Sequence, residues 1–208
     1  MTIFYLIRHA TNDLLKEGRL GGRMPGVHLN EEGQAQAQAL ADRLANVPLA
    51  AVYASPLERA RETAQPLAER HGLPVRVHPG LNEVDCGAWG GERIETLRRR
   101  RLWRALTLHA AGTRFPGGES AWEVQARMIA ALEEIRAAYP RAAVAVVSHA
   151  DPIRIAVAHA IGLPLDLFRR LLVEPASLTV LSLEGPLPRL ICLNETGGVP
   201  LPTGGKGV

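Results

Sequence analysis

The chain has 208 residues, of which 47% are apolar and 22% charged, so its size suits one globular domain and its composition excludes a disordered or fibrous protein. The net charge is only +3, although every basic residue except Lys16 and Lys206 is an arginine. No apolar stretch approaches the ~20 residues that cross a bilayer, and Arg8 interrupts the apolar start before it could act as a secretory signal, so we expect a cytoplasmic protein with no membrane contact.

Strands and helices alternate in the first half of the chain. Short β-branched and apolar runs predict strands at residues 2–7, 51–54 and 75–78. A helix is predicted from the Asn30 cap until Pro48, which forbids its extension. A second helix is predicted from Ser55 to His71, and Pro66 should bend or split it.

The second half continues this alternation. A glycine-bearing loop at residues 81–91 precedes a helical segment that reaches Ala111. Ser120 can cap a long helix that Pro140 stops. The remaining predicted elements are a buried strand, a helix and two closing strands at residues 143–148, 151–162, 178–183 and 190–193. The closing strands would form a hairpin across Gly185-Pro186.

This order of elements predicts an α/β fold, a three-layer α/β/α sandwich with a mostly parallel central sheet covered on both faces. We assign residues 1–195 to a single domain and residues 196–208, rich in Gly and Pro, to a loose C-terminal tail. In such folds, ligands bind beyond the carboxyl ends of the strands. A functional site is therefore expected at that edge of the sheet.

Two predicted strands end in a histidine at that edge, His9 and His149. Arg8 precedes His9, and Arg59 lies on the first turn of the helix that follows the second strand. A lone histidine or arginine at a strand end is usually a polar surface group. Together, however, two imidazoles and two forked guanidinium groups suit a tetrahedral phosphate dianion, to which the start of that helix adds its positive dipole end.

Four short motifs carry a resemblance to a known family. They are Arg-His-Ala-Thr at 8–11, Ser-Pro-Leu-Glu-Arg-Ala at 55–60, Leu-Asn-Glu at 81–83 with Gly87 and Trp89 after it, and Val-Ser-His-Ala at 147–150. In this order and spacing, over roughly residues 2–195, the chain resembles the histidine phosphatase superfamily, also called the phosphoglycerate-mutase-like family. The resemblance implies the fold predicted above and a phosphatase of the histidine acid type.

The resemblance also implies a role for each matching residue. His9 matches the nucleophile of the family, and Arg8, Arg59 and His149 match its phosphate-binding groups. Glu83 matches its acid, although a glutamate in a loop would on its own be interpreted as a surface carboxylate.

The chain departs from the family pattern at two positions. Ala10 replaces the usual Gly after the nucleophile, which restricts the turn. Leu15 stands where the commoner members have a phosphate-binding Asn, and Asn12 or Arg23 could compensate for its loss. We also place Gly22 and Ala150 among the predicted substrate-binding residues.

These residues predict a metal-independent phosphomonoester hydrolase without a cofactor. A neutral His9, with one ring nitrogen donating to a backbone carbonyl, would attack phosphorus and form a phosphohistidine. Arg8, Arg59 and a protonated His149 would stabilise the transferring group. Glu83, its pKa raised by its surroundings, would protonate the leaving group and later activate water.

Other catalytic designs fit less well. Neither cysteine has an arginine at the spacing of a cysteine phosphatase, and Lys206 lacks the residues of a P-loop. A cofactor-dependent phosphoglycerate mutase is an alternative, but the loop at residues 81–91 that carries Glu83, called the acid loop below, lacks the Glu-Arg-His-Tyr-Gly segment usual in mutases. A non-catalytic phosphate-binding module is a second alternative, and it would need neither His9 nor Glu83.

The substrate is expected to be a small phosphorylated metabolite. Arg23, His28 and residues 103–115 are placed at the rim that would select it, although His28 is better explained as a loop residue without contacts. The basic run at residues 98–101 is interpreted as a solvated helix face, and no aromatic residues alternate with it to stack bases, so no nucleic-acid partner is expected. An oligomer is compatible with the sequence but is not predicted by it.

Overall fold

The computed structural model describes residues 1–184 and 187–197, which contain a six-stranded sheet in the order β3-β2-β4-β1-β5-β6. Its strands are β1 (Thr2–Arg8), β2 (Leu49–Ala54), β3 (Val75–Val77), β4 (Ala143–Ser148), β5 (Leu178–Glu184) and β6 (Leu187–Glu195). The first four strands run parallel, while β5 is antiparallel to β1 and β6 is antiparallel to β5. The predicted α/β fold with a mostly parallel sheet is confirmed.

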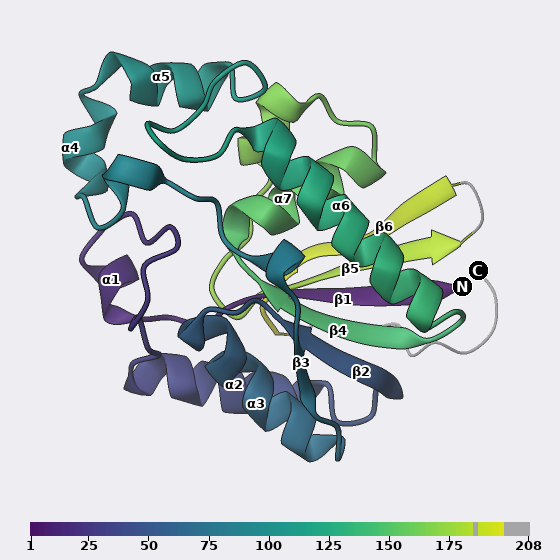
Figure 1. Ribbon diagram of the computed structural model, residues 1–208. Helices are drawn as coiled ribbons and strands as arrows, with labels where there is room; N and C mark the ends of the chain where they lie inside the picture. The colour runs from purple at the N-terminus through teal and green to yellow at the C-terminus, as the bar shows by residue number, and fades with distance from the viewer. Residues whose placement is uncertain (185–186, 198–208) are drawn as a thin grey trace.

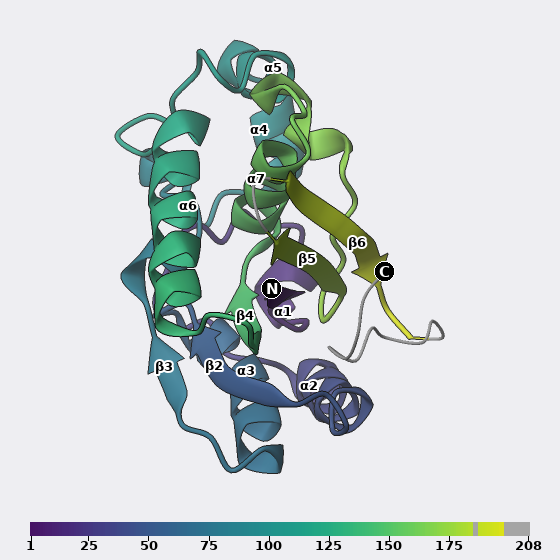
Figure 2. The same cartoon turned by 90° about the vertical axis from the view of Figure 1, so that its right-hand side faces the viewer.

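Helices cover both faces of this sheet (Figure 1, Figure 2). The longer helices are α2 (Glu31–Arg43), α3 (Glu58–Arg70), α6 (Ala121–Ala138) and α7 (Ala150–Ala160). Helices α2 and α3 pack on one face, and α6 and α7 pack on the other. The side chains of β1 alternate between the two layers: Tyr5 and Ile7 face α2 and α3, and Phe4 and Leu6 face α6 and α7, all of them fully buried. A strand buried on both sides requires the continuous apolar run seen in its sequence.

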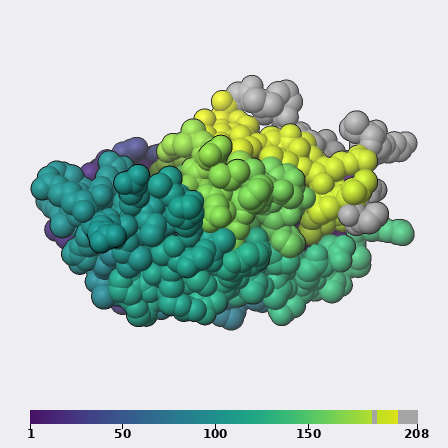
Figure 3. Space-filling view, turned by 90° about the horizontal axis from the view of Figure 1, so that it is seen from above, coloured from purple at the N-terminus to yellow at the C-terminus, as the bar shows by residue number. Residues whose placement is uncertain are grey.

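A third apolar cluster lies beyond the sheet. It joins α4 (Ile94–Arg98) and α5 (Arg101–Leu108) to the 3-10 turn Leu165–Arg170, and its centre is Trp89, which stacks on Trp103 at a ring distance of 6.2 Å. The space-filling view shows the teal segment that contains α5 beside the green segment after α7 on one face of the molecule (Figure 3). Val84 and Cys86 of the loop that carries Glu83 also pack in this cluster.

Several element boundaries differ from the prediction. The helical segment before Ala111 is two short helices, because Arg100 takes an extended backbone and lays its guanidinium over the Trp89 ring at 5.4 Å. Helix α2 ends at Arg43, five residues before Pro48. Pro66 does not split α3, whose apolar face is packed on both sides of it.

Two further predictions concern the end of the chain. The proposed turn at Gly185-Pro186 and residues 198–208 of the predicted tail lie outside the described residues. Within the part that is described, Glu195 at the end of β6 pairs with Arg43 of α2. In the same part of the chain, no helix has the length and apolar character needed to span a bilayer.

Candidate active site

The parallel pairing of β1 with β4 brings the two strand-end histidines together. Arg8 is in register with Ser148, and the His9 backbone N–H donates to the Ser148 carbonyl at 2.9 Å. The rings of His9 and His149 are therefore 5.1 Å apart and inclined at 63°. His9 is 3% exposed and His149 is fully buried, so both imidazoles lie inside the carboxyl edge of the sheet.

His9 has a defined tautomer. Its Nδ1 lies 2.8 Å from the Ala10 carbonyl oxygen, which can only accept, so Nδ1 carries the proton and Nε2 keeps its lone pair. Burial lowers the pKa of His9 well below its usual range, and the charges of Arg59 and Arg8 lower it further. The ring is consequently neutral and nucleophilic. The alanine after it fits this turn because Ala10 does not adopt a positive φ, and its N–H donates to Thr63 Oγ1 at 2.9 Å.

Two guanidinium groups lie beside the histidines. Arg59, on the first turn of α3 and 2% exposed, donates from Nη2 to the Gly22 carbonyl at 2.7 Å. Arg8 donates from Nη1 to the Val173 carbonyl at 2.8 Å, while its buried Nε has no hydrogen-bond partner among the described residues. No carboxylate of the described chain forms a salt bridge with either group. Buried guanidinium groups with spare donors and no salt-bridge partner suit the binding of an anion.

Glu83 reaches the same cluster from the loop after the 3-10 turn Pro79–Leu81. Its Oε2 lies 3.8 Å from His149 Nδ1, and its Oε1 accepts from the Val84 N–H at 2.8 Å. Burial raises the pKa of Glu83 to about 7, and the charge of Asp151 adds to the rise against the opposing effect of Arg59. The carboxyl group can therefore hold or release a proton near neutral pH.

His149 is neutral in the site without substrate. Burial lowers the pKa of His149 well below its usual range, and the charge of Arg59 acts in the same direction, so the imidazole is neutral rather than protonated. Its Nε2 bonds Ser55 Oγ at 2.8 Å, and its buried Nδ1 has no hydrogen-bond partner within the described part. The predicted protonated form of His149 belongs to the step with phosphate bound, and it stays a prediction.

The other predicted binding residues divide into two groups. Gly22 and Ala150 adjoin the cluster, Gly22 through its bond to Arg59 and Ala150 as the first residue of α7 after His149. The Asn12 side-chain oxygen instead caps the short helix α1 (Asp13–Lys16) by accepting from the Leu15 N–H at 3.0 Å.

Arg23 also bonds groups other than His9, His149, Arg8 and Arg59. It donates to Glu119 at 2.7 Å and to the Glu83 carbonyl at 3.0 Å. Asn12 and Arg23 therefore both have structural partners, and neither lies free in place of the asparagine that the family has at position 15.

Sequence reasoning assigned no role to three buried hydroxyls around the cluster. Ser55 bonds His149, Ser148 donates to the Leu81 carbonyl at 2.8 Å, and Thr63 donates to the Arg59 carbonyl at 2.7 Å. Thr63 could have been found, because it lies four residues after Arg59 and so shares its face of the helix. Ser55 and Ser148 lie within the motifs already quoted.

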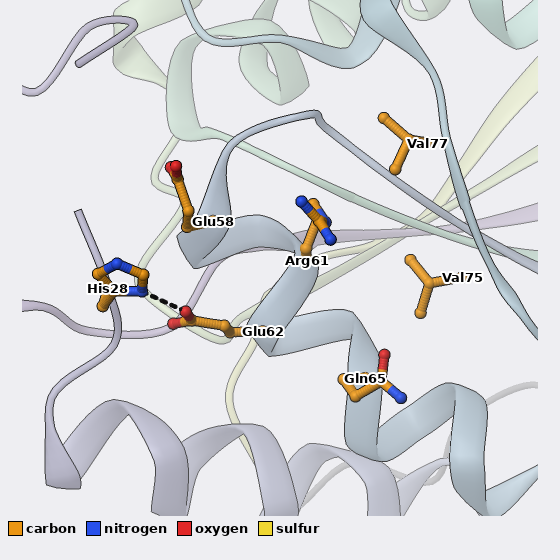
Figure 4. Close-up of a pocket in the computed structure, with 7 residues that line it drawn as sticks. All are labelled: His28, Glu58, Arg61, Glu62, Gln65, Val75 and Val77. Atoms are coloured by element: carbon orange, nitrogen blue, oxygen red, sulfur yellow. Dashed lines mark hydrogen bonds and ion pairs between the residues drawn. The ribbon is translucent and has the colours of Figure 1, made fainter. Parts of the chain in front are cut away.

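A separate hollow of about 470 Å³ lies between α3, β3 and the segment before α2. It is lined by His28, Glu58, Arg61, Glu62, Gln65, Val75 and Val77 (Figure 4). There, His28 bonds Glu62 at 2.5 Å, and this hydrogen bond raises the pKa of His28. The prediction of a loop residue without contacts is therefore wrong, because His28 bonds Glu62 of α3. None of His9, His149, Arg8, Arg59 and Glu83 lines this hollow.

The described residues contain no group of three His, Cys, Asp or Glu side chains that could hold a metal ion. The two cysteines are free: Cys86 is buried, which raises the pKa of its thiol, and Cys192 is half-buried.

Comparisons with known proteins agree with this geometry. The chain is 32% identical to phosphoserine phosphatase 1 of Hydrogenobacter thermophilus over 94% of its own length and 93% of that protein. It is also 32% identical to a Photorhabdus laumondii protein named "Probable phosphoglycerate mutase GpmB", over 84% of its own length and 82% of that protein. The structure of a mycobacterial glucosyl-3-phosphoglycerate phosphatase in complex with VO3 superposes with a TM-score of 0.86 at 29% identity, covering 93% of this chain and 99% of that one.

A family model settles the assignment. The model of the histidine phosphatase superfamily, branch 1, matches residues 4–196, which include both strand-end histidines and the acid loop. On this match and on its similarity to phosphatases, the chain belongs to the histidine phosphatase superfamily.

Proposed function

We propose that the protein is a metal-independent phosphomonoester hydrolase that acts on a small phosphorylated metabolite through a phosphohistidine at His9. One observation carries the proposal: the His9 Nδ1 proton is held by the Ala10 carbonyl, which leaves the Nε2 lone pair free in a site that also holds the guanidinium groups of Arg8 and Arg59. A neutral imidazole with a fixed tautomer, among groups that bind a dianion, is what attack on phosphorus requires.

In the first step, His9 Nε2 forms a bond to phosphorus while the bond from phosphorus to the ester oxygen breaks. Glu83 gives its proton to the departing oxygen, so the alcohol leaves neutral. Arg8 and Arg59 hold the equatorial oxygens, and the bound dianion raises the pKa of His149 so that its Nδ1 can donate as well.

In the second step, water attacks the phosphohistidine. The Glu83 carboxylate removes a proton from that water, the bond from Nε2 to phosphorus breaks, and inorganic phosphate is formed. Both His9 and Glu83 return to their starting protonation states when phosphate leaves. One carboxyl group thus serves as acid and then as base, a dual role suited to a pKa near 7.

The relatives support the substrate class. Their names specify phosphoserine and glucosyl-3-phosphoglycerate as substrates of those proteins, and both are small metabolites that carry a phosphate ester. We extend to this chain only that shared chemistry. The mutase name of the Photorhabdus laumondii relative favours phosphoglycerate mutase as the second candidate.

A panel of small phosphomonoesters, assayed with a chelator present on the wild type and on His9→Ala, tests the proposal. We expect hydrolysis by the wild type and none above background by the variant. Activity that survived the substitution or required a divalent cation would overturn the mechanism. Transfer that depended on a bisphosphoglycerate primer, without release of phosphate, would favour the mutase.

A further inference from the structure

A half-buried carboxylate outside the histidine cluster binds two arginines from distant segments. Glu119, whose side chain is 16% exposed, accepts at Oε1 from Arg23 Nη2 at 2.7 Å and from Arg127 Nε at 2.9 Å. Its Oε2 accepts from Arg127 Nη2 at 3.0 Å and from the Asp85 N–H at 2.9 Å. Burial raises the pKa of Glu119, but the hydrogen bonds from Arg127 and Asp85 outweigh it and leave that pKa below its usual value, so the group is ionised at neutral pH.

Both arginines also donate hydrogen bonds to backbone carbonyls in or next to the acid loop. Arg127, in the second turn of α6, donates to the carbonyls of Gly80, Asn82 and Glu83 at 2.9, 2.7 and 2.9 Å. Arg23 donates to the same Glu83 carbonyl at 3.0 Å. Two guanidinium groups therefore donate to the Glu83 carbonyl, and both of them also donate to the Glu119 carboxylate.

The loop that carries Glu119 also lies directly against the acid loop. The Glu119 N–H donates to the Asp85 carbonyl at 2.8 Å, and the Ala88 N–H donates to the Pro116 carbonyl at 2.9 Å. The two backbones approach so closely that a Cβ added at Gly118 would meet the Asp85 carbonyl oxygen at 2.2 Å. Only glycine fits there, so close backbone contact is built into this pair of loops.

We propose that Glu119 is a positioning residue for the acid: acting through Arg127 and Arg23, it fixes the loop that aims the Glu83 carboxyl at the leaving group. This inference rests on the proposed function, because it presumes that Glu83 protonates an ester oxygen. Glu119, Arg127 and Arg23 form a clamp on this loop. Glu119 and Arg127 are assigned no contact with phosphate, and Arg23, which the sequence placed among the substrate-binding residues, uses its Nε and Nη2 in the clamp. Their effect is on proton transfer, which depends steeply on geometry: a misplacement of about 1 Å can cost on the order of a hundredfold in rate.

A comparison of two substrates with different leaving groups distinguishes this positioning role from a general effect on activity. An alkyl phosphate needs a proton on its departing oxygen, whereas 4-nitrophenyl phosphate releases a stable phenolate without one. The ratio kcat/KM reports all steps up to departure of the leaving group, before water attacks. We would measure it with both substrates for the wild type, Glu119→Gln, Arg127→Lys and Glu83→Gln.

A matched control comes from the same helix. Glu133 pairs with Arg136 further along α6 and has no bond to the acid loop. Glu133→Gln therefore removes an equivalent charge at a position that does not contact this loop. Circular dichroism and thermal unfolding would confirm that each variant is folded. Arg127→Lys keeps the positive charge but loses the fork, so it tests the clamp even if Glu119→Gln does not fold.

The expected result is a selective loss. Glu119→Gln and Arg127→Lys should lower kcat/KM for the alkyl phosphate by on the order of a hundredfold while changing that for 4-nitrophenyl phosphate by less than about threefold, as Glu83→Gln should also do. Equal losses with both substrates in folded variants, or no loss with either, would overturn the clamp. Failure of the wild type to hydrolyse either substrate would instead refute the proposed function, so the two failures are distinguishable.

Discussion

Glu83 Oε2 lies 3.8 Å from Nδ1 of His149, close enough for an ion pair, but the imidazole is neutral and the carboxyl keeps its proton up to about pH 7. The pKa of the carboxyl is raised to about 7 by burial, and the pKa of the imidazole is lowered by burial and by Arg59. Because Glu83 and His149 do not form an ion pair, the proton on the Glu83 carboxyl can be transferred to the substrate. The pair is therefore poised to deliver a proton and, once a dianion is bound, to let His149 become charged.

The pH dependence of the first step follows from these shifts. Glu83 must be protonated to act as an acid, so kcat/KM for an alkyl phosphate should be constant below pH about 7 and fall tenfold per pH unit well above it. No loss is expected between about pH 6 and 7, because the pKa of His9 lies well below 6.5 and the nucleophile stays neutral there. Glu83→Gln should remove the falling limb and lower the plateau by on the order of a hundredfold or more. An unchanged limb in that variant would show that another group titrates.

The affinity for phosphate should depend on Arg59 and not on Arg61, the next arginine along α3. Arg59→Met removes a buried guanidinium that approaches the anion site, and we expect the inhibition constant of inorganic phosphate to rise about tenfold to a hundredfold, since hydrogen bonds to charged groups contribute roughly 1.5–3 kcal/mol. Arg61→Met, two residues further along the exposed side of α3, is the control and should change it little. Equal effects of the two substitutions would contradict the assignment of Arg59.

The Thr63 hydroxyl links two parts of the site: it accepts from the N–H of Ala10, next to His9, and donates to the Arg59 carbonyl. Thr63→Val keeps the shape but leaves the buried Ala10 N–H without its acceptor, so the free energy of unfolding should fall by about 1–3 kcal/mol. Urea denaturation measures this change. Thr107→Val removes a comparable bond to the Trp103 carbonyl on exposed α5 and should cost less than about 0.5 kcal/mol. A fall as small in Thr63→Val as in the control would show that this hydroxyl does not hold the two segments.

Much of the site could be predicted because its chemistry lies at strand ends. His9 and His149 directly follow apolar strands, and parallel pairing brings the carboxyl ends of such strands to one edge. Arg59 could be placed because its helix begins immediately after β2. These placements need only local sequence pattern and the general rules of parallel sheets.

The positions of other groups depend on contacts that no local pattern encodes. Arg23 was predicted to bind substrate, but it bonds Glu119, which lies 96 residues further along the chain. The neutral state of His149 follows from complete burial, which a strand-end position does not reveal. The break between α4 and α5 depends on Arg100 stacking over Trp89, a contact between side chains of two different segments.

Trapping the phosphorylated enzyme tests the central claim most directly. Glu83→Gln should react with 4-nitrophenyl phosphate, which needs no acid, and then hydrolyse slowly for lack of a base, so the covalent intermediate should accumulate. Rapid quenching in alkali, followed by peptide mass spectrometry, should find one phosphoryl group on His9 that acid treatment removes. Phosphate on another residue, or nitrophenol released in a single turnover without any phosphorylated His9, would contradict the account.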